Sequence, residues 1–357
     1  MRILQIIDSL AIGGAEKLIV ETVPLLVAKG NQVDVVLLNG EKTHLYKELE
    51  ALNCCTIFTL GTSYYNPIYI LKLIPFFYKY DVVHVHLFPA QYFAAIARLF
   101  CFKKVKLFFT EHNTSNRRLE NKKFRLIEKL IYACYDNVIC ITEEVKSVLK
   151  EKLNLSNNKL LVIENGVNLN NVNTSIKYNR ELFNYSVNDK ILIMVAGFRE
   201  QKDQDSVIKA LKLLPEDYKL LLIGDGARRP ILEDLVETLQ LQDRVTFLGI
   251  RNDVYALMKM CDIAILSSHW EGFGLVAVEA MASGIPLIAS DVNGLAQVVD
   301  GGGLLFEPSN VEDLISKILK LNDPFLYQQT INNCLEKSKK YDINLMVDEL
   351  INLYDEN

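Results

Sequence analysis

The sequence of 357 residues has no apolar stretch long enough to cross a membrane. The longest candidate, residues 68–77, contains a lysine and a proline, whereas a spanning helix needs about 20 apolar residues. The first residues, MRILQIIDSL, carry one basic residue and a short apolar run that ends at Asp8, which is too short for an export signal. We therefore expect a cytoplasmic protein.

Paired cysteines and a strong excess of one charge are also missing. The seven cysteines are scattered and never have the C-x2-C spacing, so we expect neither a disulfide framework nor a zinc site. The 39 basic and 44 acidic residues give a net charge of -5, which does not indicate a nucleic-acid-binding protein. The sequence has no internal repeat and no low-complexity tract.

What the sequence does contain is enough apolar material for two cores. Half of the residues are apolar, and the length is about twice that of a typical domain of roughly 150 residues. Short β-branched runs alternate with longer amphipathic segments, which is typical of βαβ units and parallel sheets. The runs predict strands at 3–7, 33–38, 56–60, 82–85, 106–110, 137–141 and 160–163, and again at 191–197, 219–224, 244–249, 262–267 and 286–290.

The alternation restarts after an asparagine-rich, apolar-poor segment at 165–189, which divides the chain. We predict an N-terminal doubly wound domain over 1–168 and a second such domain over 169–357. The last segment, 323–354, has helical periodicity and no strand. We expect its final helices, 340–357, to cross back onto the N-terminal domain.

Ligands in such sheets bind beyond the carboxyl ends of the strands, so the turns at these ends are candidate sites. The first turn contains the adjacent glycines Gly13 and Gly14, which allow the backbone to approach an anion closely. The dinucleotide pattern G-x-G-x-x-G is absent there and also at Gly224, which argues against a nicotinamide enzyme.

The second half carries two turns that suit a nucleotide diphosphate. Arg199 and Lys202 follow a predicted strand, three residues apart, so both cations can reach oxygens of one polyanion. Further on, Glu271 lies in a glycine-rich loop, Gly274 precedes a predicted helix, and Glu279 lies within that helix. Phosphate oxygens would meet N–H groups at the helix start, and Glu279, about 7.5 Å along the axis, would bind both ribose hydroxyls.

Taken in order, these motifs make the chain similar to retaining GT-B glycosyltransferases of family 4, of the type that builds bacterial surface polysaccharides. The resemblance extends over nearly the whole chain and implies an α/β fold with two Rossmann-like doubly wound domains facing a central cleft. It rests on the Gly13–Glu16 turn, Thr110-Glu-His112, Asn165-Gly-Val-Asn168, the Gly197, Arg199 and Lys202 turn, and Glu271-x7-Glu279.

The resemblance also implies roles for individual residues. A nucleotide sugar, most often UDP-linked, would bind in the cleft and mainly to the second domain, and no metal or other cofactor is expected. His112 would orient the donor sugar near its anomeric carbon. The implied catalytic residues are His112, Arg199, Lys202 and Glu271. The implied donor-binding residues are Gly13, Gly14, Gly197, Arg199, Lys202, Arg251, Glu271, Phe273, Gly274, Leu275, Val276 and Glu279.

Two patterns that could suggest a metal have simpler interpretations. His84 and His86 share a strand face but have no third ligand at a suitable spacing, so we interpret them as cleft lining or packing. Asp203-Gln-Asp205 lies in the predicted first turn of a helix, where the helix dipole favours acidic residues. We interpret it as structural.

No nucleophile with an attendant base is recognisable. The resemblance implies that basic groups and helix ends stabilise the departing diphosphate while an acceptor hydroxyl attacks from the same face. We therefore predict transfer of a hexose or N-acetylhexosamine to a glycan or lipid-linked sugar acceptor. A sugar-nucleotide epimerase and a non-enzymatic two-lobed sugar-binding protein are the alternatives.

The charge distribution indicates where the acceptor binds. Residues 98–129 contain ten basic and three acidic side chains interleaved with five phenylalanines, which suits an anionic membrane surface. Residues 1–170 carry 21 basic and 16 acidic residues, a net charge of +5, which leaves -10 for the remainder. We predict peripheral docking of 98–129 on the inner face of the membrane. The alternative is a solvated face with some of the aromatic rings in the core.

Overall fold

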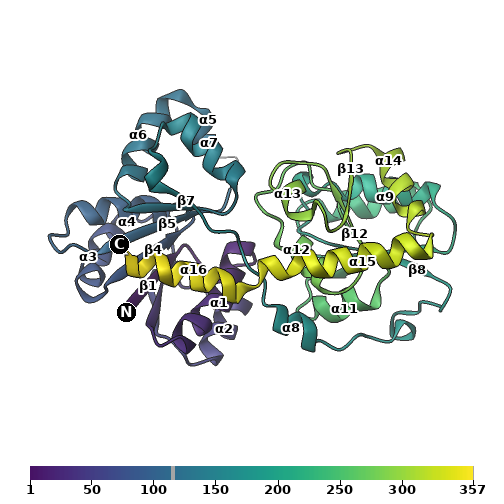
Figure 1. Cartoon of the computed structure of the whole chain (residues 1–357), viewed down its shortest axis with the longest axis horizontal. Helices are drawn as coiled ribbons and strands as arrows, with labels where there is room; N and C mark the ends of the chain where they lie inside the picture. Colours follow the sequence, from purple (N-terminus) through teal and green to yellow (C-terminus); the bar gives the residue numbers. More distant parts are fainter. Residues whose placement is uncertain (114–116, 357) are drawn as a thin grey trace. The chain divides into compact units, whose positions relative to one another are not determined.

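The computed structural model describes residues 1–113 and 117–356 and forms two compact units, shown in Figure 1. Unit 1 comprises Met1–Gly166 together with Ile343–Asn357, and unit 2 comprises Val167–Asp342. The division therefore falls two residues before the predicted boundary at 168. The predicted second domain, 169–357, included final helices, 340–357, that were expected to cross back onto the N-terminal domain, and the residues from Ile343 onward belong to unit 1.

Unit 1 contains a seven-stranded parallel sheet in the order β3-β2-β1-β4-β5-β6-β7. The strands are nearly continuous apolar runs because helices cover both faces of a parallel sheet. They are β1 (Arg2–Ile7), β2 (Gln32–Asn39), β3 (Ile57–Gly61), β4 (Val82–His86), β5 (Lys106–Glu111), β6 (Asn137–Cys140) and β7 (Leu160–Val162).

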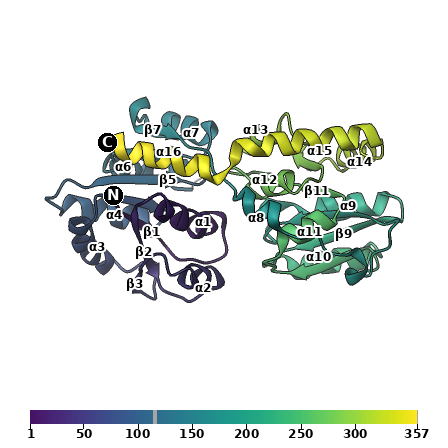
Figure 2. The same ribbon diagram turned by 60° about the horizontal axis from the view of Figure 1, so that its bottom comes forward.

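The helices of unit 1 form two groups. α16 packs against α1, which packs against α2, whereas α3, α4, α6 and α7 contact one another in sequence. Figure 2 shows α16, the last helix, beside α1. The helices are α1 (Gly14–Ala28), α2 (His44–Ala51), α3 (Ile68–Lys79), α4 (Ala90–Leu99), α5 (Arg117–Glu120), α6 (Lys122–Ala133), α7 (Glu143–Leu153), the 3-10 turn η1 (Asn157–Lys159) and α16 (Ile343–Glu356).

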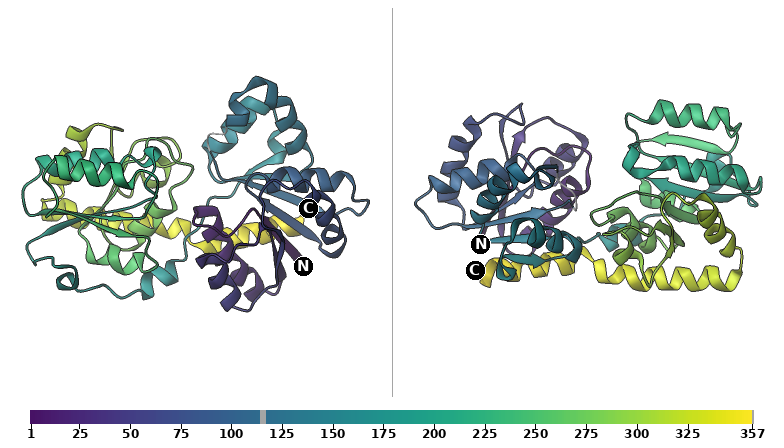
Figure 3. Two further views of the ribbon diagram at one scale, coloured as in Figure 1. Left: turned by 180° about the vertical axis from the view of Figure 1, so that it is seen from behind. Right: turned by 90° about the horizontal axis from the view of Figure 1, so that it is seen from above.

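The last turns of α16 lie beside β4 and β5, and Figure 3 shows this helix crossing unit 1. Lys106, the first residue of β5, donates from Nζ to the carbonyl oxygen of Tyr354 at 2.6 Å. The buried face of α16 includes Ile343, Val347 and Tyr354, each with no exposed surface. Burial of this apolar stripe is the physical reason why α16 belongs to unit 1.

Unit 2 contains a six-stranded parallel sheet in the order β10-β9-β8-β11-β12-β13. The strands are β8 (Lys190–Val195), β9 (Tyr218–Ile223), β10 (Val245–Gly249), β11 (Ile263–Leu266), β12 (Leu287–Ser290) and β13 (Leu304–Phe306). The helices are α8 (Leu169–Thr174), α9 (Gln204–Leu213), α10 (Arg229–Thr238), α11 (Val254–Met260), α12 (Leu275–Ala282), α13 (Ala296–Val299), α14 (Val311–Lys320) and α15 (Pro324–Ser338), with 3-10 turns η2 (Arg180–Phe183), η3 (Glu200–Lys202) and η4 (Lys339–Tyr341).

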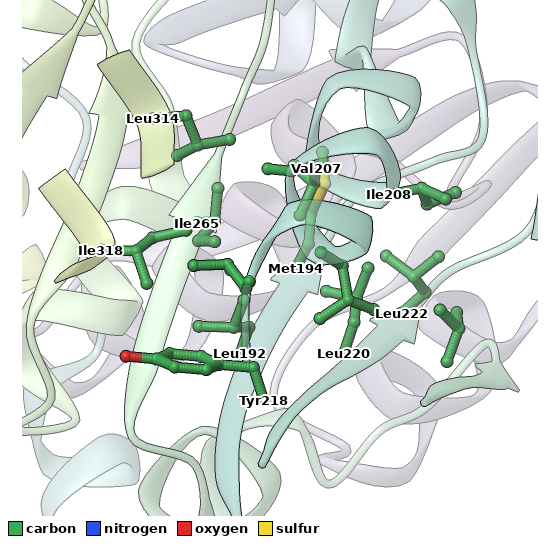
Figure 4. Packing of buried hydrophobic residues seen from close by; sticks show 14 of the residues in the cluster. Leu192, Met194, Val207, Ile208, Tyr218, Leu220, Leu222, Ile265, Leu314 and Ile318 are labelled. Atoms are coloured by element: carbon green, nitrogen blue, oxygen red, sulfur yellow. The ribbon is translucent and has the colours of Figure 1, made fainter. Parts of the chain in front are cut away.

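The core of unit 2 follows from the two-residue period of its strands. Every second side chain of these strands enters the same core layer, namely Leu192 and Met194 in β8 and Leu220 and Leu222 in β9. Figure 4 shows these side chains packed together with Val207 and residues of α14. This layer holds β8 and β9 rigidly, so the loops that leave their carboxyl ends start from fixed positions.

The strand orders confirm the predicted α/β fold with two Rossmann-like doubly wound domains and identify a switch point in each sheet. The strand order reverses between β1 and β4 in unit 1 and between β8 and β11 in unit 2. Loops diverge at such points and leave room for a ligand beyond the carboxyl ends. Within the described residues, no helix combines the length and the apolar character needed to traverse a bilayer.

Candidate active site

Three sequence-predicted histidines come together in unit 1. His84 and His86 alternate along β4, and His112 directly follows β5. Nδ1 of His86 lies 3.1 Å from Nε2 of His112, and the ring centres of His84 and His86 are 4.2 Å apart. Nε2 of His86 lies 2.9 Å from Oε1 of Gln5, across the β1–β4 switch point. Nε2 of His84 lies 2.7 Å from Oγ1 of Thr110.

Burial keeps these imidazoles neutral at physiological pH. It lowers the pKa of His84 to about 3 and that of His112 to about 4, because a charged ring would lose its hydration here. Burial and the neighbouring histidines also lower the pKa of His86 well below its usual value. The three rings therefore act as neutral hydrogen-bonding groups, each with one donor and one acceptor nitrogen. The interpretation of His84 and His86 as lining and packing residues is confirmed.

The histidines line a cavity of about 30 Å³ within unit 1. Asn165, from the predicted Asn-Gly-Val-Asn motif, lies on its wall, and Met346 and Leu350 of α16 contribute further lining. The hydroxyl of Tyr354, one turn beyond Leu350, lies 2.5 Å from Nδ1 of His84. The helix α16 is thus part of the histidine site.

In the glycine turn after β1, the carboxylate of Glu16 lies close to Gly13. Gly13 precedes α1, of which Gly14 is the first residue, and a Cβ on Gly13 would lie 2.2 Å from a carboxylate oxygen of Glu16. Asp8, which follows β1, is buried and accepts a 2.9 Å hydrogen bond from the N–H of Ala90. Burial raises the pKa of Asp8 to about 7, and the nearby Glu16 adds to this shift. This strand end therefore contains a carboxyl group that ionises near neutral pH.

In unit 2 the loop after β8 carries Gly197, Arg199 and Lys202. It packs against the loop after β9 so closely that a Cβ on Gly224, at φ +131°, would lie 2.0 Å from the carbonyl oxygen of Ala196. The close packing of the two loops therefore requires glycine at position 224, although the dinucleotide-binding pattern G-x-G-x-x-G is absent there. Arg199 is exposed, and its side chain makes no hydrogen bond or ion pair with another residue in the described part of the chain.

Lys202 and Glu271 form an ion pair at the ends of β8 and β11, across the switch point of unit 2. Their side chains are only 21% and 17% exposed. Oγ of Ser268 donates to the same carboxylate oxygen at 3.2 Å, and Oγ of Ser267 donates to the carbonyl oxygen of Lys202 at 3.0 Å. The structure thus brings two of the predicted catalytic residues into contact and ties their loops together.

The helix α12 begins beside this ion pair with an open N-terminus. Its N-cap is Gly274, in the left-handed conformation at φ +84°, so no side chain caps the first N–H groups, at Leu275 and Val276. A Cβ on Gly294, in the facing loop, would lie 2.3 Å from the carbonyl oxygen of Glu271. Both loops therefore need glycine, and no side chain caps the positive end of the helix dipole.

The other predicted donor-binding residues differ in how available they are. Glu279 is buried at 4% exposure within α12, where it accepts a 3.2 Å hydrogen bond from the Tyr255 hydroxyl. Arg251 is paired with Asp253, with its Nε 2.8 Å from Oδ1, and this contact lowers the pKa of the Asp253 carboxyl. Phe273 is 2% exposed, so a ligand would meet the backbone at this position and not its ring.

The Asp203-Gln-Asp205 pattern is structural, as predicted. Asp203 caps α9 by accepting from the N–H of Ser206, and Asp205 accepts two hydrogen bonds from Arg228 at 2.7 and 2.8 Å. Both carboxylates therefore have protein partners. In the described ranges no group of three or more His, Cys, Asp or Glu side chains is arranged to hold a metal ion.

The basic segment 98–129 has a more mixed structure than its composition indicates. Phe108 and Phe109 lie in the core on β5, whereas Phe100, Phe102 and Phe124 are exposed, so only some of the aromatic rings are available at the surface. Several of the cations bind backbone carbonyl oxygens nearby: Arg98, Lys103, Lys106 and Arg125. Residues 114–116 lie outside the described residues.

Sequence reasoning missed several polar residues of these sites. Gln5 had a visible signal, because it is the one polar side chain inside the apolar run 3–7, and so did Asp8, the first residue after that run. Tyr255 and Tyr354 had no such signal, because the helical pattern does not distinguish them from the other tyrosines of the sequence. Their partners are set by tertiary packing.

Profiles of two glycosyltransferase families match the chain. The family described as "Glycosyl transferases group 1" matches residues 177–337, and "Glycosyltransferase Family 4" matches residues 12–171. An uncharacterized glycosyltransferase of Methanocaldococcus jannaschii is 33% identical over 285 residues, which cover 77% of this chain and 75% of that protein. The chain therefore belongs to the glycosyltransferases of group 1 and family 4, which favours a transferase over the epimerase and sugar-binding alternatives.

Two further similarities extend over almost the whole chain. A diphospho-undecaprenol 4-alpha-N-acetylgalactosaminyltransferase of Campylobacter jejuni, whose acceptor carries N-acetylgalactosamine and N,N'-diacetylbacillosamine, is 27% identical over 357 residues, 94% of each chain. The crystal structure of Anabaena HepE in complex with UDP and glucose superposes with a TM-score of 0.87 at 21% identity, covering 100% of both chains. This likeness confirms the GT-B fold.

Proposed function

We propose that this protein is a retaining glycosyltransferase that transfers a hexose or N-acetylhexosamine from UDP to a glycan or lipid-linked sugar acceptor in polysaccharide synthesis. The observation that carries the proposal is the pairing of Lys202 with Glu271 beside the uncapped N-terminus of α12. The UDP in the HepE complex supports this choice of nucleotide, and the diphospho-undecaprenol acceptor of the Campylobacter relative supports a lipid-linked acceptor.

The donor diphosphate binds where unit 2 presents positive charge. Arg199 is exposed and has no ion-pair partner among the described residues, and the first N–H groups of α12 carry the positive end of the helix dipole. Lys202 exchanges the carboxylate of Glu271 for phosphate oxygens. Glu279, held by Tyr255, accepts hydrogen bonds from the ribose hydroxyls. These cationic groups take the role that a metal has in other transferases, so we propose no metal requirement.

Transfer breaks the bond between the anomeric carbon and the diphosphate oxygen and forms a bond to the acceptor oxygen on the same face of the sugar. The acceptor hydroxyl proton passes to the departing diphosphate oxygen, so charge and atoms balance. Arg199, Lys202 and α12 stabilise the negative charge that develops on the leaving group. His112 of unit 1 orients the donor sugar near its anomeric carbon.

Removing either cation tests the proposal. We expect Arg199→Ala and Lys202→Ala to fold normally and to lose about two orders of magnitude in kcat, because a developing charge loses a donor worth about 3 kcal/mol. Lys209→Ala is the matched control, since Lys209 is exposed on α9, the helix that follows the cationic loop. Assays combine UDP-sugars with lipid-linked acceptors and follow UDP release. Near-normal activity in both variants would contradict the proposal.

We further propose that α6 docks on an anionic membrane surface, where a lipid-linked acceptor is available. This helix exposes Phe124, Leu126, Ile127 and Leu130, and it also carries Lys122, Lys123 and Lys129 on exposed positions. Apolar side chains flanked by lysines favour the interface of a membrane with anionic lipids. This pattern supports peripheral attachment through unit 1.

Vesicle sedimentation tests the docking surface. We expect the protein to sediment with phosphatidylglycerol vesicles at low salt and to remain in the supernatant with phosphatidylcholine vesicles. Leu126→Ser should reduce sedimentation severalfold, whereas Leu213→Ser, at a leucine of similar exposure in unit 2 (65% against 68%), should not. Equal recovery with both kinds of vesicle would count against docking.

A further inference from the structure

Buried polar side chains of unit 1 form two adjacent series of hydrogen bonds, Thr110–His84–Tyr354 and Gln5–His86–His112, and the ring centres of His84 and His86 are 4.2 Å apart. We call the two series together the histidine relay. It joins α16, β1, β4 and β5, which are distant in sequence, and its members are almost fully buried except for His112. They are Thr110, His84, Tyr354, Gln5, His86 and His112.

The orientation of the Gln5 amide determines the direction of the relay. Its carbonyl oxygen lies 2.9 Å from Nε2 of His86, and because a carbonyl oxygen can only accept, this nitrogen carries the proton. Nδ1 of His86 is then an acceptor, and Nε2 of His112, 3.1 Å away, must donate to it. His112 therefore has its proton on Nε2. Its Nδ1 has no hydrogen-bond partner within the described ranges.

The other end of the relay has the same direction. An interaction with the Gln5 side chain opposes the rise that burial causes in the pKa of Tyr354, which connects the two series. With the direction that we assign to this end, the hydroxyl of Tyr354 donates to Nδ1 of His84 over 2.5 Å, and Nε2 of His84 donates to Thr110 over 2.7 Å. Each donor meets one acceptor. Changing the tautomer of His112 alone would place two nitrogen electron pairs face to face at His86, and changing that of His84 alone would leave the buried hydroxyl hydrogen of Tyr354 without this acceptor, each at the cost of an unsatisfied group.

We propose that the relay is a positioning device that holds His112 in a single tautomer, with the proton on Nε2 and with Nδ1 free to accept a hydroxyl proton of the donor sugar. Gln5, His86 and Tyr354 are its positioning residues. The contact with the sugar rests on the proposed function above, whereas the tautomer is a property of the protein alone.

A fixed tautomer matters because a neutral imidazole otherwise exchanges between two forms with opposite hydrogen-bonding character. In the wrong form, an N–H would face the sugar where an acceptor is needed. Burial disfavours the charged form of His84 and His112 at neutral pH, so protonation does not offer a way around this choice. A tyrosine on the last helix thus sets the acceptor character of an active-site histidine.

Nitrogen NMR of the unliganded protein tests the tautomers directly. With imidazole-15N labelling and assignment by single His→Gln variants, the relay predicts a pyrrole-type Nε2 and a pyridine-type Nδ1 for His84, His86 and His112. A proton on Nδ1 of any of the three, or averaged shifts for His112, would overturn the proposal. This measurement needs no substrate, so it stands even if the proposed transferase activity fails.

Tyr354→Phe tests the positioning role, with Tyr135→Phe as a matched control. Both tyrosines are almost fully buried in unit 1, each packs on a phenylalanine of β5, and each hydroxyl makes a 2.5 Å hydrogen bond, but that of Tyr135 goes to the carbonyl oxygen of Gln91. We expect mixed His112 tautomers in Tyr354→Phe and an unchanged spectrum in Tyr135→Phe. An unchanged spectrum in both variants would overturn the proposal.

Activity provides an independent readout. Tyr354→Phe should lower kcat roughly threefold to tenfold with little change in the KM for the donor, because about one hydrogen bond is lost at the sugar in part of the molecules. Gln5→Met, which removes the acceptor for His86, should act in the same direction if Tyr354→Phe folds poorly. If Tyr354→Phe has mixed His112 tautomers but full activity, the proposed role of His112 at the sugar is wrong, whereas the relay itself is supported.

Discussion

Replacing Asp8 with asparagine should stabilise unit 1, and mainly at neutral and alkaline pH. Burial, with a smaller contribution from Glu16, raises the pKa of Asp8 from 3.8 to about 7. A shift of one unit corresponds to about 1.4 kcal/mol, so the ionised carboxylate costs about 4 kcal/mol of stability above pH 7. Asparagine retains an oxygen to accept from the N–H of Ala90 and has no charge to bury.

The sign of this effect follows from the protons bound in each state. Between about pH 4 and pH 7 the folded protein keeps the Asp8 proton that the unfolded chain has lost, so the free energy of unfolding falls as pH rises through this window. Below the window both states are protonated, and above it both are ionised. The advantage of Asp8→Asn should therefore be small near pH 4.5 and greatest at pH 8.

Hydrogen exchange of the β1 and β4 amides, corrected for the pH dependence of the intrinsic exchange rate, measures the free energy of unfolding of unit 1 with and without the substitution. The fluorescence of Trp270, the only tryptophan of the sequence, follows unit 2 and serves as an internal control. We expect a gain of about 4 kcal/mol in unit 1 at pH 8 and no change in the fluorescence transition. An equal gain at both pH values, or no gain at pH 8, would refute the reasoning.

Three further perturbations test other parts of the structure. Gly224→Ala should destabilise unit 2 by about 3 kcal/mol or more in urea unfolding, since its Cβ would overlap a backbone carbonyl oxygen. Arg118→Met leaves the buried Glu128 without its cation and should cost about 3–5 kcal/mol, with much of the loss recovered in a double variant that also carries Glu128→Met. Glu271→Gln frees Lys202 and should tighten UDP binding roughly threefold to tenfold in calorimetric titration, and weaker binding would contradict competition between the carboxylate and diphosphate.

Much of the fold could be predicted because the parallel strands leave a clear pattern. Buried strands with apolar runs alternate with helices, and the structure contains a strand within one or two residues of each predicted one. The strand β13 was not predicted, since its three residues follow a run of three glycines and give too short a pattern. The periodicity of the final segment indicated a helix with an apolar stripe to cover, and α16 lies in unit 1, the domain onto which this segment was expected to return.

The candidate site was predictable where a motif follows a strand, and not where neighbours are decided by sheet order. Glu271 and Lys202 are 69 residues apart, and only the adjacency of β8 and β11 brings them into contact. The same holds for Gln5 and His86, which meet because β1 lies next to β4. Local pattern indicated the types of residue needed for diphosphate binding, while the tertiary fold selected their partners.

The participation of α16 in unit 1 has a consequence for the biosynthesis of the protein. On the ribosome, residues 1–166 emerge long before 343–357, and the intervening unit 2 is completed first. Until α16 arrives, the side of α1 that contacts it has no cover, and the buried His84 lacks the hydroxyl of Tyr354. Unit 1 therefore matures last although it is translated first, and an isolated version of it needs 343–357 joined to 1–166.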